Sequence, residues 1–300
     1  RPADNACILA SPRVEYINCR ATSPRRLDVH GAFSLCARVV CRGESELVSN
    51  IAGDDVEQRK NTVTVNQPAG FSQQQFSVDE VLELGRGKPP ADSILRSDAF
   101  AVLQDFKLTS GKLMIRGEAC VKFLYSSAGE SESLETMEYS IPFSQVLDCA
   151  GAEDDCLCDV KLDVASVEAQ IKNDYSGDKT FFDTQVKIFA SAEACRSTQV
   201  TFVNDAYSKK YDLALESKQK SLDSLTEVVS DTFSHKAELA ADDSAVSKVI
   251  DVWSEMGSVS AEASEGNVRF KGKYSLCVLA FNAENKPFYF ERLLNFEYSK

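Results

Sequence analysis

The chain has 300 residues, of which 43% are hydrophobic and 26% charged, and this is enough for two ordinary domains with packed cores. Its formal net charge of −13 argues against nonspecific nucleic-acid binding and against docking on anionic membranes. No apolar stretch approaches the roughly 20 residues of a membrane-spanning helix, so membrane insertion is not expected.

The first predicted strands lie in the opening third of the chain. In residues 27–40 the side chains of Leu27, Val29, Phe33 and Leu35 share one register, and residues 61–66 also alternate between polar and apolar. Alternation with a period of two is typical of a strand that buries one face. We therefore expect antiparallel strands from the start of the chain.

The same alternation continues over residues 113–125, 184–194 and 268–281, with Phe189 out of step. Gly117 and Gly272 lie inside two of these runs, where a glycine usually marks a bulge or a bend. Clusters of turn-forming residues follow the runs, and we expect hairpin connections there. These clusters are Ser126–Gly129, Ser176–Asp178 and Asn282–Asn285.

Few segments favour a helix. Pro89–Leu95 predicts the start of a short helix, with proline in its first turn. Residues 244–253 suit either a helix or a strand. The sequence therefore predicts a mainly β fold, with tandem antiparallel β-sandwich-like modules and a few short helices.

An internal repeat organises the chain. Residues 111–144 reappear as residues 266–299, at an offset of 155 and without a gap; Gly111–Gly117, for example, aligns with Gly266–Gly272. The same alignment brings residues 244–253 near residues 94–106, so both segments should take the same structure. Self-similarity at this scale indicates tandem copies of one folding unit.

A second repeat accounts for the rest of the chain. Residues 14–18 resemble residues 167–171 at an offset of 153, and residues 26–30 resemble residues 181–185 at an offset of 155. We expect the back half of one repeat over residues 1–68, a complete repeat over residues 69–205 and the front half of a third over residues 206–300, as in a piece of a longer protein. The terminal halves should either form incomplete sheets whose edges pair with another molecule or be small modules themselves.

Ten cysteines in 300 residues are far too few for a disulfide scaffold. Cys36, Cys41 and Cys277 occupy apolar positions of predicted strands, as small buried hydrophobic residues do. The repeats do not match the cysteines, since Cys120 aligns with Ser275. A reducing compartment is the simpler expectation.

Four stretches resemble the SPOCS domain family of spore-forming anaerobic bacteria. The first is Ser11–Val29, with the sequence SPRVEYINCRATSPRRLDV, and the others are Pro89–Leu95, Glu138–Ser144 and Asn204–Tyr211. The resemblance covers nearly the whole chain and is weakest over residues 230–265. It implies a structural or interaction role in the mother-cell cytoplasm or the spore coat. Some family members dock through a LysM domain; this chain shows no LysM segment, so that role is not carried over.

The sequence does not predict an enzyme. Nucleophilic catalysis needs a histidine beside a nucleophile, and the two histidines, His30 and His235, lie on polar positions without a nucleophile-elbow or cysteine-hydrolase motif. Gly85–Pro89 lacks the spacing of a phosphate-binding loop. We therefore expect no catalytic residues and no cofactor.

One segment combines thiols and carboxylates. Glu153–Asp159 holds Cys156 and Cys158 together with four acidic residues. Zinc sites usually need a second ligand pair, and none stands out, so an acidic loop entering a strand is favoured over a metal site. Exposed thiols at Cys156 or Cys158 would allow intermolecular disulfides during coat maturation, and we state this as a hypothesis.

A local basic patch stands out on this acidic protein. It consists of Arg13, Arg20, Arg25 and Arg26. The patch suits an ion-pair interface with an acidic partner or another repeat, although a solvated loop around Pro24 is the favoured interpretation. Both interpretations stay open.

Aromatic residues gather near the end of the chain. They are Phe281, Phe288, Tyr289, Phe290, Phe296 and Tyr298. At alternate positions such residues usually form sheet core or cross-strand pairs, whereas an exposed strip would suit a glycan.

Together these features favour a non-enzymatic structural or assembly protein of the spore envelope. Its expected partners are spore coat or envelope proteins, with self-association through exposed strand edges. The alternative is a module that binds carbohydrate, the cell-wall glycan.

Overall fold

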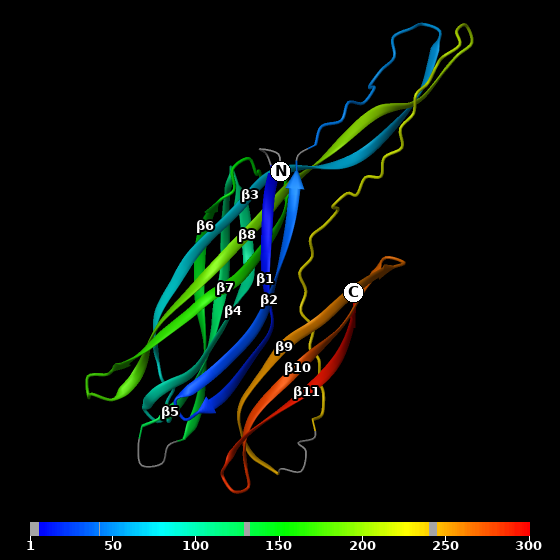
Figure 1. Ribbon diagram of the computed structural model, residues 1–300. Helices are drawn as coiled ribbons and strands as arrows, with labels where there is room; N and C mark the ends of the chain where they lie inside the picture. Colours follow the sequence, from blue (N-terminus) through cyan, green and yellow to red (C-terminus); the bar gives the residue numbers. More distant parts are fainter. Residues whose placement is uncertain (1–5, 42, 129–132, 240–244) are drawn as a thin grey trace.

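The computed structural model describes residues 6–41, 43–128, 133–239 and 245–300, and all helical or strand structure in these ranges is β (Figure 1). The strands are β1 (Ala6–Ser23), β2 (Arg26–Cys41), β3 (Val56–Glu83), β4 (Ala91–Thr109), β5 (Lys112–Ser127), β6 (Leu134–Asp148), β7 (Leu157–Asn173), β8 (Lys179–Ser208), β9 (Val246–Ser264), β10 (Asn267–Asn282) and β11 (Pro287–Ser299). The mainly β prediction is confirmed.

The short helix predicted from Pro89 is wrong. Within the described residues, the segment after Pro90 is the start of β4, and its backbone pairs with β5. Residues 246–253 likewise begin β9, so the two segments do share one structure. Alternating side chains and a pairing partner override the local preference of proline for a first helical turn.

The strands form four antiparallel sheets, in the orders β1–β2, β3–β8–β7, β4–β5–β6 and β11–β10–β9. The second and third sheets pack face to face, with β7 beside β4 and β3 beside β6, and we call this pair the central sandwich (Figure 1). The turns at residues 176–178 and 282–285 connect hairpins as predicted, whereas Gly129 of the first turn cluster lies outside the described residues.

The central sandwich has an aromatic core. The Phe182 ring lies 5.0 Å from the Phe123 ring and 5.7 Å from the Tyr125 ring, and all three side chains are fully buried. A second buried cluster surrounds Leu113, Ile115 and Leu147. Inward-facing residues of both sheets thus fill one continuous interior, as in other β-sandwiches.

Two sheets repeat one another at an offset of 155. β4 and β9 have the same length and start 155 residues apart, and so do β5 and β10. The connecting turns match as well: Ser110 and Glu265 have φ of 47° and 51°, and a glycine with positive φ follows each.

The last strand of the repeat departs from the ungapped alignment. Gly117 of β5 pairs with Phe143 of β6, and Gly272 of β10 pairs with Phe296 of β11, so these strands correspond at an offset of 153. The ungapped alignment over residues 292–299 is therefore wrong by two residues. Each glycine lies under the ring of its partner, and the ladder slips close to both glycines, as expected from a glycine inside a strand.

A two-stranded ribbon projects from the central sandwich. It consists of residues 56–67 of β3 and residues 196–208 of β8, which pair only with each other in the described structure (Figure 1). The connections before and after it run back along the ribbon. The Val203 amide donates a hydrogen bond to the Val48 carbonyl, at 2.6 Å. The two connections also contact each other, through a side-chain hydrogen bond from Lys220 Nζ to Ser45 Oγ at 2.9 Å.

We call residues 209–239 the strap, because this extended segment joins the ribbon to the β9–β10–β11 sheet. The Phe233 ring lies 5.4 Å from the Phe296 ring and 4.8 Å from the Tyr298 ring. His235 Nδ1 lies 2.8 Å from the Tyr274 hydroxyl. The strap therefore covers the β11 side of this sheet.

Candidate functional site

The β1–β2 hairpin carries most of its large apolar side chains on one face. Cross-strand pairs such as Val14 with Phe33 and Cys19 with Val29 place them there, with a bulge at Glu15 that keeps both strands in phase. We call this surface the hairpin face; it comprises Ile8, Pro12, Val14, Ile17, Cys19, Ala21, Leu27, Val29, Phe33, Leu35 and Val39.

The hairpin face is open to solvent. Phe33 is 78% exposed and Ile17 66% exposed, and the other large members of the face are about half exposed or more. On the opposite face Arg38 forms an ion pair with Glu193 of β8, which directs the hairpin face away from the central sandwich. An exposed apolar patch of this extent usually marks an interaction site.

The hairpin face matches the buried inner face of β7 and β8. When the bulge at Glu15 is aligned with the bulge at Ala165, β1 corresponds to β7 at an offset of 150, and β2 corresponds to β8 at 155. Residues 14–18 therefore align with residues 164–168, and the offset of 153 predicted from the sequence is wrong.

Each exposed apolar residue of the hairpin face then has an inward-facing counterpart. For β1 the counterparts include Leu162, Val164, Val167, Ala169 and Ile171, and for β2 they include Phe182, Thr184, Ile188, Ala190 and Ala194, the latter set at most 1% exposed. The hairpin is thus half of a sandwich, and among the described residues no sheet covers it.

The β9–β10–β11 sheet is open on the corresponding side. Its β11 side lies under the strap, but Val249, Val252, Met256 and Val259 of β9 are 39–62% exposed. These four residues, together with Val268 of β10, face the same side of the sheet, and we call them the open sheet face. In the central sandwich the equivalent strand, β4, is covered by β7.

A charged cluster joins this sheet to the central sandwich. Asp251 is almost completely buried, with Oδ1 2.6 Å from Lys122 Nζ and Oδ2 3.8 Å from Arg96 Nη1. The Arg96 guanidinium also stacks 3.9 Å above the Trp253 ring. Burial alone would lower the pKa of Lys122, but its hydrogen bonds to Asp251 and Glu138 outweigh burial and raise that pKa. We call Arg96, Lys122, Asp251 and Trp253 the junction cluster.

The junction extends along β9. Lys248 Nζ lies 3.3 Å from Glu135 Oε1, and the Thr136 hydroxyl donates a hydrogen bond to the Ile250 carbonyl. The hydrogen bond from Lys88 lowers the pKa of Glu135 below its usual value. Burial of the carboxylate opposes this shift, and the hydrogen bond from Lys248 adds to it. Lys248 and Ile250 contact β6, whereas residues 251–253 contact β5 and β4. β9 therefore crosses the outer face of the β4–β5–β6 sheet.

The predicted basic patch lies at the turn of the β1–β2 hairpin. Arg20 and Arg26 are exposed on the polar face, where Arg26 Nε lies 3.5 Å from Asp28 Oδ1, and Arg25 is exposed in the turn after Pro24. Arg13 lies further along β1, and its side chain is outside the described residues. The described arginines therefore gather opposite the hairpin face and not on it.

The two cysteines of the acidic loop have different surroundings. Cys156 is partly exposed, whereas Cys158 is 6% exposed and packs in the second core cluster, where burial raises its pKa to about 12. Of these two, only Cys156 has the setting that an intermolecular disulfide needs. Cys36 and Cys41, which were expected to be buried, are exposed on the hairpin. The nine cysteines within the described residues are free, and no group of three or more histidine, cysteine or acidic residues there is placed to hold a metal ion.

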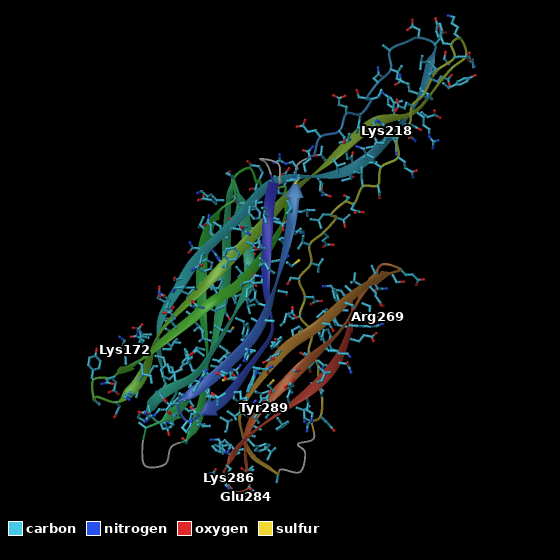
Figure 2. The ribbon with its side chains drawn as sticks, viewed as in Figure 1. Lys172, Lys218, Arg269, Glu284, Lys286 and Tyr289 are labelled. Atoms are coloured by element: carbon cyan, nitrogen blue, oxygen red, sulfur yellow. The ribbon has the colours of Figure 1, made fainter. Side chains whose placement is uncertain are left out.

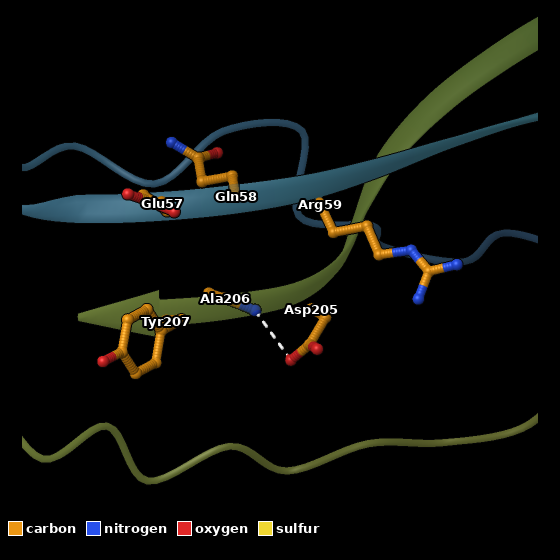
Figure 3. A pocket seen from close by; sticks show the side chains of 6 residues that line it. All are labelled: Glu57, Gln58, Arg59, Asp205, Ala206 and Tyr207. Carbon is orange, nitrogen blue, oxygen red and sulfur yellow. Dashed lines mark hydrogen bonds between the residues drawn. The ribbon is translucent and has the colours of Figure 1, made fainter. Parts of the chain in front are cut away.

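The remaining candidates do not converge on a reaction centre. His30 is exposed opposite Asn18 on the polar face of the hairpin. A concavity on the ribbon is lined by Glu57, Gln58, Arg59, Asp205, Ala206 and Tyr207. Figure 3 shows Gln58 and Tyr207 pointing to opposite sides of the two strands.

Most of the aromatic residues near the end of the chain pack within the structure. Phe296 is buried under Phe233, and Phe288 stacks on Phe290 at 5.9 Å. Tyr289 is half exposed and stacks on Trp253 at 5.8 Å. Arg269 lies at one end of this sheet, and Glu284 and Lys286 lie at the other (Figure 2).

One comparison with known proteins identifies part of the chain. Residues 90–172, which run from the start of β4 to the last turn-side residues of β7, match the family model described as SipL, SPOCS domain. The predicted resemblance is therefore confirmed over this segment. No curated protein and no solved structure matches the chain. Within the described residues, no helix is long and apolar enough to cross a membrane.

Proposed function

We propose that the chain is a non-enzymatic structural protein of the spore envelope that acts through protein–protein contacts. The observation that supports this most is the hairpin face, whose apolar side chains are exposed although their counterparts are buried in β8 and partly buried in β7. Burying such a surface against a partner removes apolar area from water and favours association. The SPOCS match over residues 90–172 supports a role related to the spore.

The expected partners are proteins of the spore coat or envelope, and the expected location is the mother-cell cytoplasm or the coat. A surface of this kind binds by shape and apolar contact, while the polar rim sets the orientation. Of the exposed arginines, Arg25 in the hairpin turn lies at the end of this surface and suits an acidic group on a partner, whereas Arg20 and Arg26 lie on the opposite face.

A capture experiment with matched variants tests this function. The whole chain, Phe33→Asp and His30→Asp serve as baits in lysates of sporulating cells, with bound proteins quantified by mass spectrometry. Coat proteins should be recovered with the unaltered chain and with His30→Asp, which changes the polar face, and lost with Phe33→Asp. Equal recovery with all three baits would contradict a role for the hairpin face.

Binding to purified cell-wall glycan is measured in parallel. Retention of all three baits on glycan, without capture of coat proteins, would favour the carbohydrate-binding alternative, for which half-exposed Tyr289, stacked on Trp253, is the residue to alter.

A further inference from the structure

We propose that the hairpin face of one copy docks on the open sheet face of a second copy and completes a second sandwich between them. This inference rests on the proposed role in protein–protein contacts and names the partner of the same surface. The two surfaces are the inner faces of the two halves of one folding unit, carried at opposite ends of a single chain.

The central sandwich supplies the template for this contact. There the inner face of β7 and β8 packs on the inner face of β4, β5 and β6. The hairpin corresponds to β7–β8 residue by residue, including the bulge at Glu15, and the β9–β10–β11 sheet corresponds to β4–β5–β6. A surface that fits the first pair should also fit the second, because the same positions are apolar in both.

The strap already occupies one of the three places opposite the open sheet. In the central sandwich Phe76 of β3 lies 5.3 Å from Phe143, the residue that pairs with Gly117. In the other sheet Phe233 of the strap lies 5.4 Å from Phe296, the residue that pairs with Gly272. The strap therefore takes the place of β3. Part of β10 is covered as well, since Val278 and Ala280 on the same face are buried, and the open part of this face lies along β9, where β7 would pack in the template.

The exposed residues show where the hairpin would lie. Val249, Val252, Met256 and Val259 all belong to β9, the strand equivalent to β4, which β7 covers in the central sandwich. Docking would place β1 over the face of β9, as β7 lies over β4, and would place β2 between β1 and the strap. The polar residues of the hairpin, such as Arg20 and His30, would stay on the outer surface, so the contact buries mainly apolar groups.

A second copy is the occupant, because the halves within one chain do not cover each other. The hairpin of the chain directs its polar face toward β8, through Arg38 and Glu193, and leaves its apolar face exposed. Each copy offers one hairpin and one open sheet. Contacts of this head-to-tail type are heterologous and add further copies unless a ring closes.

Two single variants test the proposal. Phe33→Asp places a charge on the hairpin face, and Met256→Asp places one on the open sheet face. Molar mass is measured by sedimentation of the whole chain over a wide range of concentration, with circular dichroism to verify folding. The unaltered chain should form species that grow with concentration, and each variant alone should stay a monomer.

Mixing the variants gives the decisive result. An equimolar mixture has one intact hairpin face, from Met256→Asp, and one intact open sheet face, from Phe33→Asp, so it should form a dimer with twice the monomer mass and nothing larger. His30→Asp and Leu293→Asp, on the opposite faces of the hairpin and the sheet, should associate as the unaltered chain does.

Three outcomes would overturn the proposal. One is an unaltered chain that stays monomeric at all concentrations. Closure of the hairpin on the open sheet of its own chain would give this result and would therefore also overturn the proposal. Another is a mixture of folded variants without dimers. The third is association that persists in both variants. A monomeric chain that still captures coat proteins would refute this inference and leave the proposed function standing.

Discussion

Arg96 and Asp251 occupy the same position in two copies of the repeat, 155 residues apart, and they face each other with opposite charge. Arg96 Nη1 lies 3.8 Å from Asp251 Oδ2, and Lys122 Nζ approaches the other oxygen of the same carboxylate. Neither sheet contributes the cluster alone. The contact between consecutive copies of the repeat therefore depends on the two copies having residues of opposite charge, arginine and aspartate, at the same position.

Replacement of Asp251 by asparagine should destabilise the junction. The carboxylate is almost fully buried, and its loss leaves Arg96 and Lys122 only their more exposed partners, Asp98 and Glu138. Because both cations are also partly solvated, we expect about 1–3 kcal/mol and not the full cost of breaking a buried pair. Urea unfolding followed by Trp253 fluorescence measures the change. Asp98→Asn is the control, since Asp98 contacts Arg96 at a more exposed site; equal effects of the two changes would contradict the prediction.

Alanine at Gly117 or Gly272 should also destabilise its sheet. An added Cβ would lie 2.7 Å from Phe143 Cζ in the first case and 2.5 Å from Phe296 Cζ in the second, so both rings must move. At Gly117 it would also clash with the Val102 carbonyl oxygen of the neighbouring strand. Overpacking of this kind typically costs about 1–3 kcal/mol. Thermal unfolding compares both variants with Gly43→Ala, where no heavy atom lies within 4 Å of the new methyl group. Unchanged melting of the first two variants would show that the rings yield freely.

The strap should loosen in acid. Hydrogen bonds from the Tyr298 hydroxyl at 2.6 Å and from Lys300 lower the pKa of Asp231 from 3.8 to about 2. Because the folded pKa is the lower one, the stabilisation is fully present above about pH 4 and is lost as the pH falls toward 2.

Hydrogen exchange of strap amides between pH 4 and pH 2 measures this effect. Asp231→Asn should remove the excess acid sensitivity in that window, whereas Asp212→Asn, elsewhere in the strap, should keep it. Identical pH profiles for Asp231→Asn and the unaltered chain would sink the assignment.

Thiol reactivity should separate the cysteines. Thiolates are the reactive species, so Cys158, buried and with a pKa near 12, should resist alkylation in the folded protein, as should buried Cys149. Exposed Cys19, Cys36 and Cys41 should be modified first, followed by partly exposed Cys156. Peptide mapping after brief alkylation at mild alkaline pH, repeated in urea, measures the order. Rapid labelling of Cys158 without denaturant would mean that the sandwich opens readily.

Much of the fold could be predicted from the sequence, because alternation and turn residues act locally. Residues 113–125 and 268–281 are strands as predicted, and the turn at Asn282 connects β10 to β11. The helix predicted from Pro89 is wrong, because the segment pairs with β5 and local preferences do not show such a long-range contact.

The repeat was visible in the sequence, but its register was not. An alignment that is wrong by two residues still places apolar residues on apolar residues, since side chains in a strand alternate with a period of two. Phe296 therefore aligned well with Ile141, although the pairing with Gly272 makes it equivalent to Phe143.

The interaction surfaces were only partly predictable. The shared register of Leu27, Val29, Phe33 and Leu35 was evident, yet a sequence pattern cannot show whether a sheet covers them. The junction cluster was missed altogether, because its members are distant in sequence and each is unremarkable alone. The only signal was the opposite charge of Arg96 and Asp251 at one aligned position.

The first residue of β3 pairs with the last residue of β8, Val56 with Ser208, and Lys210 Nζ lies 2.8 Å from Asp55 Oδ2 beside this pair. The chain thus enters and leaves the whole span from β3 to β8 at one point. A chain in which residue 55 is joined directly to residue 209 would lose the central sandwich and keep the hairpin, the strap and the last sheet. The number of copies in such a protein can therefore change by insertion or deletion at a single site and without a new linker, although the contacts of Asp251 with Arg96 and Lys122 would be lost with the central sandwich.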